Sequence, residues 1–223
     1  MKQTAQTHVF IVGALGIAMT YLALTGRINN YLQPGFRPAS LATGLVLVAL
    51  ALWSAVRPNS FSSRRTSWFL LVPVCVVAVF APAALGAATL NSSGVTRVVG
   101  NNLDDLALPK LAKDQLNPMT MEELITRFLR SDSATFDGTV VEVEGFASAA
   151  ADGTWRLSRY KIYCCAADAM AYTATLETST SMRSDQWYRV RGVVRVSSAH
   201  NPQFPVIEVD NLEAIDTPTE PYL

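Results

Sequence analysis

Three long runs of the chain contain no Asp, Glu, Lys or Arg, and together they fill most of the first hundred residues. The runs cover residues 3–26, 38–56 and 66–96. A transmembrane helix needs about 20 mostly apolar residues, so runs of this length are typical of membrane spans. The pattern therefore predicts an α-helical membrane block of about three transmembrane helices, at approximately residues 8–24, 38–56 and 68–87.

The first and third runs each carry a feature that qualifies this prediction. Lys2 followed by an apolar core and small residues also fits a cleaved signal peptide. Because the core is long and two further runs follow, a retained anchor is the better interpretation. Pro73 and Pro82 predict a kink in the third span, which a helix bundle tolerates. Small residues in the first two spans allow close helix contact: Gly13, Gly16 and Gly44.

The pattern changes after residue 87. Residues 88–118 are polar and rich in Asn, Ser, Gly and Pro, which predicts a linker between a transmembrane domain at 1–87 and a soluble domain at 119–223. The soluble domain starts with a helix signal. Thr120 precedes the apolar sequence and Glu123 lies three residues later, a capping-box pattern. Three residues are expected to form the apolar face of this helix: Leu124, Phe128 and Leu129.

Beyond Phe136 the hydrophobic period becomes two, which indicates β-strands. Five alternating stretches cover residues 136–148, 154–165, 171–177, 187–198 and 205–215. The inward positions expected for the second stretch are Trp155, Leu157, Tyr160 or Ile162, and Cys164. Five strands after one helix predict an all-β domain built as a small OB-like Greek-key barrel, with a plain β-sandwich as the alternative.

Charge is divided along the chain in the same way as hydropathy. The formal net charge is zero, but the first acidic residue is Asp104, and residues 1–100 hold seven of the 18 basic residues. A carboxylate near the bilayer centre is costly, so an acid-free half supports the membrane assignment. Lys2 and the basic loop at 57–65 share one side of the predicted bundle. The positive-inside bias then predicts a multi-pass protein of the cell (inner or plasma) membrane with its C-terminal domain outside the cytoplasm.

Cysteine supplies the candidate chemistry. The adjacent Cys164 and Cys165, with Asp168 and with His200 from a later loop, form a candidate metal-ligand set. Thiolates favour zinc or copper(I). Adjacent residues on a strand point to opposite faces, so the two thiols can share an ion only if the strand ends there. The alternative interpretation places Cys164 in the core, leaves Cys165 partly exposed and makes Asp168 a turn cap.

Other chemistries are less well supported. The sequence contains no HExxH, GxSxG, CxxC or phosphate-loop motif, so we expect no enzyme and no catalytic residue. A thiol enzyme would require an exposed Cys165 with a lowered pKa. Arginines on the fourth strand would give the sheet a basic face, which is a feature of nucleic-acid-binding domains. The soluble half is acidic overall, however, and ion pairing with Glu142, Glu144 and Glu177 is the simpler expectation, so we expect no nucleic-acid partner.

The C-terminal half resembles a known family at four places. These are FDGTVVEVEGF at 136–146, RYKIYCCAADA at 159–169, QWYRVRGVV at 186–194 and PTEPYL at 218–223. The Cys-Cys-Ala-Ala-Asp run, with Arg159 before it, is the most specific. The resemblance is to uncharacterised bacterial two-domain membrane proteins that are described as permease subunits, and the N-terminal spans with residues 31–34 also suit this family. It implies a larger polytopic permease as partner and assigns no role to Arg159, Cys164, Cys165 or Asp168.

Two functional hypotheses follow. The first is a non-catalytic accessory subunit of a permease, held in the lipid bilayer, with an extramembrane β domain that binds a partner or substrate. Three spans are too few to enclose a transport pathway alone, which favours an accessory role. The second is a metal-binding or metal-delivery membrane protein that uses Cys164, Cys165 and Asp168, with zinc or copper as its ion.

Overall fold

A computed structural model of the protein describes residues 2–56, 72, 85–92, 108–112, 115–130, 133–196 and 204–223. The chain divides into two compact units. The first contains residues 1–84 with Cys164–Ala166, and the second contains Leu85–Tyr163 and Ala167–Leu223.

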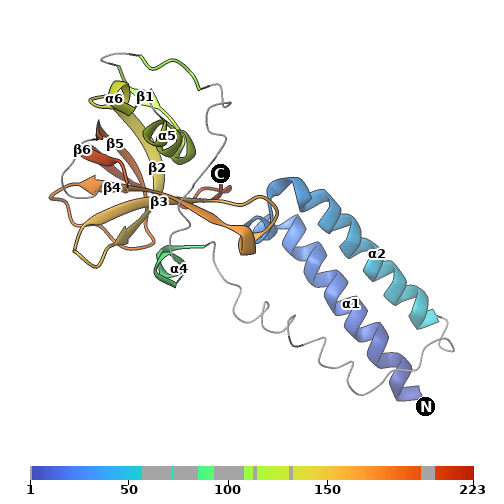
Figure 1. Cartoon of the computed structure of the whole chain (residues 1–223). Helices are drawn as coiled ribbons and strands as arrows, with labels where there is room; N and C mark the ends of the chain where they lie inside the picture. The colour runs from blue at the N-terminus through green and yellow to red at the C-terminus, as the bar shows by residue number, and fades with distance from the viewer. Residues whose placement is uncertain are drawn as a thin grey trace. The chain divides into compact units, whose positions relative to one another are not determined.

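The first unit is a helical hairpin, drawn in blue in Figure 1. Helix α1 spans Lys2–Leu24 and α2 spans Arg37–Val56, with the short 3-10 helices η1 (Arg27–Asn30) and η2 (Pro34–Phe36) between them. Gly26, at φ 74°, takes the left-handed conformation that commonly ends a helix. The Arg37 Nε donates a hydrogen bond to the Ala23 carbonyl at 2.7 Å, which ties the start of α2 to the end of α1.

Glycine permits the two helices to approach closely, as the sequence predicted. A Cβ atom on Gly16 would lie 2.9 Å from the Gly44 carbonyl oxygen, and one on Gly44 would lie 2.6 Å from the Thr20 hydroxyl. No side chain larger than hydrogen fits at either position without a shift. The backbones of α1 and α2 are therefore in close contact at Gly16 and Gly44.

The predicted number of membrane spans is wrong for the described residues. Only one helix among them, Pro34–Val56, is long and apolar enough to cross a membrane by length and composition. In the region of the first predicted span the apolar helix runs only from Val9 to Leu24, because polar residues occupy the first turns of α1. The third predicted span, 68–87, lies outside the described residues apart from Val72 and Leu85–Ala87.

The second unit is a closed five-stranded barrel. Its strands are β2 (Val140–Ala149), β3 (Trp155–Lys161), β4 (Met170–Glu177), β5 (Trp187–Arg195) and β6 (Val206–Ile215). The order is β2-β3-β4-β6-β5, and β5 pairs back onto β2. All pairings in the barrel are antiparallel except β4–β6, which is parallel. Closure excludes the sandwich alternative and confirms the predicted OB-like barrel.

The barrel interior is filled by the alternating apolar residues that the sequence identified. Leu157 on β3 is fully buried, and so are Val190 and Val194 on β5. Between and beside these valines, Arg191 and Arg195 are exposed to solvent. Helix α5 (Met121–Leu129) packs on the barrel through Met121, Leu124 and Ile125. Leu129, predicted on the buried face, is 41% exposed, and Phe128 is only half-buried.

The predicted linker contains structure that belongs to the barrel unit. Helix α4 (Ala87–Ser92) and strand β1 (Asn117–Pro118) both lie within 87–118, and β1 pairs in parallel with β2. The Ala87 amide donates to Asp185 Oδ1 at 2.5 Å, and the hydroxyls of Thr89 and Tyr160 are 2.8 Å apart. These contacts come from residues about 70 to 100 positions later in the chain, which is why local composition did not predict them.

Candidate functional site

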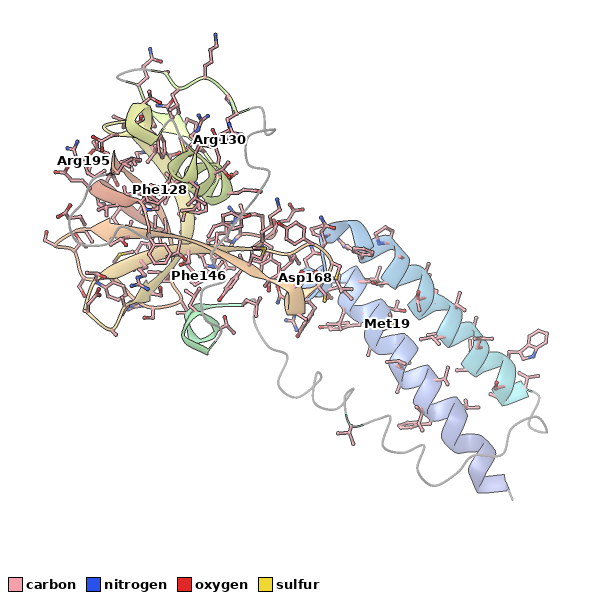
Figure 2. The ribbon with its side chains drawn as sticks, viewed as in Figure 1. Met19, Phe128, Arg130, Phe146, Asp168 and Arg195 are labelled. Atoms are coloured by element: carbon pink, nitrogen blue, oxygen red, sulfur yellow. The ribbon has the colours of Figure 1, made fainter. Side chains whose placement is uncertain are left out.

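The candidate site is the loop between β3 and β4. Strand β3 ends at Lys161, and the following Ile162 is the last buried residue before the loop. The 3-10 turn η5 (Ala166–Asp168) then leads into β4. Figure 2 labels Asp168 at the end of this turn. Asp168 Oδ1 accepts a hydrogen bond from the Tyr163 amide at 2.9 Å, so the carboxylate closes the loop on itself. This is the turn-capping role that the alternative interpretation assigned to Asp168.

Three potential ligands converge within this loop. The sulfurs of Cys164 and Cys165 are 3.7 Å apart. One ligand atom from each cysteine and from Asp168 lies within 4.8 Å of the others. Strand geometry would separate adjacent side chains, but β3 has ended three residues before Cys164. The geometric condition for a shared ion is therefore met, and metal binding itself stays a prediction.

The two cysteines differ in exposure. Cys164 is exposed and Cys165 is partly exposed. This corrects the alternative interpretation for Cys164, which extended the inward alternation of β3 to that residue. The alternation stops at Ile162, where the backbone leaves the strand. A sulfur–sulfur distance of 3.7 Å also means that no disulfide joins the pair, since a disulfide bond is about 2.05 Å long.

The backbone of the cysteine pair is held within the first unit. Leu32 and Cys165 form an isolated antiparallel bridge. The Gln33 amide donates to the Cys164 carbonyl at 3.2 Å, and the Ala166 amide donates to the Tyr31 carbonyl at 2.8 Å. These bonds use main-chain atoms only, so no hydrophobic pattern or motif could have signalled them. They fix the backbone on both sides of the two thiols.

The remaining predicted site residues lie elsewhere. His200 is outside the described residues. The Arg159 guanidinium donates to the Glu220 carbonyl at 2.8 Å and lies 5.5 Å from the centre of the Trp187 ring. Burial lowers the pKa of Arg159. The structure therefore gives Arg159 a role in holding the C-terminal segment 220–223, which sequence reasoning missed.

The arginines of β5 face carboxylates on neighbouring strands. Arg189 pairs with Glu144 at 2.8 Å and Arg191 pairs with Glu142, as the sequence predicted. Arg195 pairs with Glu208 on β6 at 2.8 Å, and not with Glu177. The hydrogen bond that Arg189 donates to the Glu144 carboxylate raises the pKa of Arg189. Each of the three arginines on β5 thus has a carboxylate partner.

Comparison with known proteins adds one family match. Residues 114–223 match the model of the DUF1980 C-terminal domain, an uncharacterised domain family. None of the curated proteins compared with the chain matches it. A chain in the crystal structure of the S. pombe Stn1–Ten1 complex is 14% identical, over 47% of this chain and 81% of that chain, with a TM-score of 0.28. That score is too low to carry any functional inference.

Proposed function

We propose that this protein is a membrane-anchored, non-catalytic accessory subunit of a permease, with its barrel outside the membrane. The observation that carries the proposal is the surface of the α1–α2 hairpin. Its outward positions are large and apolar, for example Ile17 at 63% and Leu52 at 64% exposure. A surface of this kind is unfavourable in water and favourable in lipid or against other membrane helices.

The inner side of the hairpin supports the same proposal. The residues that α2 buries are small, namely Ser40, Gly44 and Ala51. The two helices therefore bury little of their own apolar surface on each other. In a membrane, close packing through small residues is the usual basis of helix association, and the larger side chains remain for lipid or for a partner.

The accessory role follows from the size of the helical block. Two described helices, even with the third predicted span, are too few to enclose a pathway for a solute. The resemblance to permease subunits supplies the expected partner, a larger polytopic protein. The barrel then serves as an extramembrane module that binds the partner or its substrate.

Membrane association and partnership can be tested on the full chain. We expect the protein to stay with the membrane fraction through high-salt and alkaline washes. After extraction in mild detergent it should co-purify with a polytopic membrane protein. Release by alkaline washing would contradict the anchor, and a chain that always purifies alone would contradict the accessory role.

A charge placed on α2 provides a sharper version of this test. Leu45 lies near the middle of α2 and is exposed, and Leu116 is an exposed leucine in the barrel unit. A lysine at the centre of a span costs about 2.5–3.5 kcal/mol. Leu45→Lys should therefore reduce membrane retention, while the matched control Leu116→Lys should not.

A further inference from the structure

We infer that the loop of Cys164, Cys165 and Asp168 is an exchangeable zinc site with two thiolate ligands, one carboxylate ligand and an open fourth position. All three ligands lie within five consecutive residues, and their donor atoms are within 4.8 Å of one another. The inference concerns this loop alone, so it holds whether or not the hairpin anchors the protein in a membrane.

The spacing of the two sulfurs is compatible with a tetrahedral ion. In a tetrahedral zinc site with Zn–S bonds of about 2.3 Å, two sulfurs lie about 3.8 Å apart. The observed distance is 3.7 Å. A linear two-thiolate site, as copper(I) can adopt, would place the sulfurs roughly 4.6 Å apart if its bonds were of similar length. The observed separation is thus closer to that of a tetrahedral site than to that of a linear one.

The supporting contacts hold this arrangement in place. The Tyr163 amide orients the Asp168 carboxylate, and main-chain bonds from Gln33 and to Tyr31 flank the cysteines. Hydrogen bonds to ligating residues commonly orient the ligands of a metal ion. The nearest lysine along the chain, Lys161, is paired with Glu122 at 2.6 Å. Its positive charge is therefore largely balanced and does not oppose a cation at the loop.

Exposure decides between a structural and an exchangeable site. Structural zinc sites have four protein ligands and help to hold a fold together. Here the described residues provide three ligands, and Cys164 is exposed to solvent. The barrel has its own apolar core, to which neither cysteine belongs. A bound zinc ion would therefore remain open to a fourth ligand from solvent, a substrate or a partner protein.

Metal titration of the purified full chain tests this inference. The protein is kept reduced in mild detergent and titrated with zinc against a chromophoric chelator, and separately with cobalt(II). We expect one ion per chain and a thiolate-to-cobalt charge-transfer band. Cys164→Ser/Cys165→Ser should abolish both signals. Asp168→Asn retains an acceptor for the Tyr163 amide but loses the carboxylate, and should weaken zinc binding about tenfold or more.

Two variants serve as matched controls. Cys75→Ser removes the third cysteine of the chain, and Asp152→Asn changes another loop carboxylate that caps a turn, through Thr154. Both should bind zinc as the parent does. The inference is overturned if the double-serine variant binds as much zinc as the parent, or if only copper(I) binds. It is also overturned if zinc removal by chelator unfolds the barrel, since the site would then be structural.

Discussion

Tyr172 shows how burial in the barrel changes the chemistry of a single side chain. It lies on β4 and is 3% exposed. Burial raises the pKa of its phenol, and the nearby Glu122 carboxylate raises it further. The pKa of Tyr160 on β3 is also raised by burial. The folded barrel therefore holds phenol protons that the unfolded chain would release in alkaline solution.

This difference predicts how stability depends on pH. A group whose pKa is higher in the folded state contributes stability that is complete below its unfolded pKa, about 10 for tyrosine, and that is lost as pH rises further. We expect the free energy of unfolding to fall above about pH 10, and to fall less steeply in Tyr172→Phe. Denaturant titrations of the parent and the variant at neutral and alkaline pH measure this. Equal alkaline slopes would contradict the role of Tyr172.

Among the elements, α5 illustrates both the success and the limit of a capping pattern. The Thr120 hydroxyl accepts a hydrogen bond from the Glu123 amide at 3.1 Å, as the capping box predicted. The Glu123 side chain, however, pairs with Arg127 at 2.6 Å. Arg127 also donates to the Pro109 carbonyl and is itself buried. The Glu123 side chain thus forms an ion pair with Arg127, and the hydrogen bond from Arg127 holds Pro109 against the helix.

Two leucines on α5 form a matched pair for a stability test. Leu124 is fully buried and Leu129 is 41% exposed. Leu124→Ala should cost about 2–5 kcal/mol of unfolding free energy, because it removes apolar contacts and leaves a cavity. Leu129→Ala should cost about 1 kcal/mol or less. Chemical denaturation monitored by tryptophan fluorescence measures both. Similar losses would mean that α5 does not contribute to the barrel core as described.

The elements also show what a sequence can and cannot reveal here. Strict alternation around Val190 and Val194 predicts β5 and its inward face, because half-buried strands require that period. Helix α4 is only six residues long and depends on Asp185, nearly a hundred residues away, so no local pattern predicts it. The types of the candidate ligands, Cys164 and Asp168, were predictable. Their convergence was not, because it depends on where β3 ends.

At the scale of the whole molecule, the division of charge predicts on which side of the membrane the C-terminal domain lies. Chemical labelling of the cysteine pair can test this orientation. Cys164 is exposed, and the positive-inside bias predicts that the C-terminal domain lies outside the cytoplasm. In a Cys75→Ser background, a membrane-impermeant maleimide should label intact cells. The same background with Cys164→Ser/Cys165→Ser should not be labelled. Labelling that appears only after permeabilisation would contradict the predicted orientation of the C-terminal domain.

The two ends of the barrel unit lie next to each other. The Leu85 amide donates to the Tyr222 hydroxyl at 3.0 Å, and the Leu223 amide donates to the Tyr160 carbonyl at 2.8 Å. The chain therefore enters the barrel unit beside the segment that contains Tyr222. A unit whose first and last residues meet can be inserted into a surface loop of another protein with little strain, because the host only has to open a short gap.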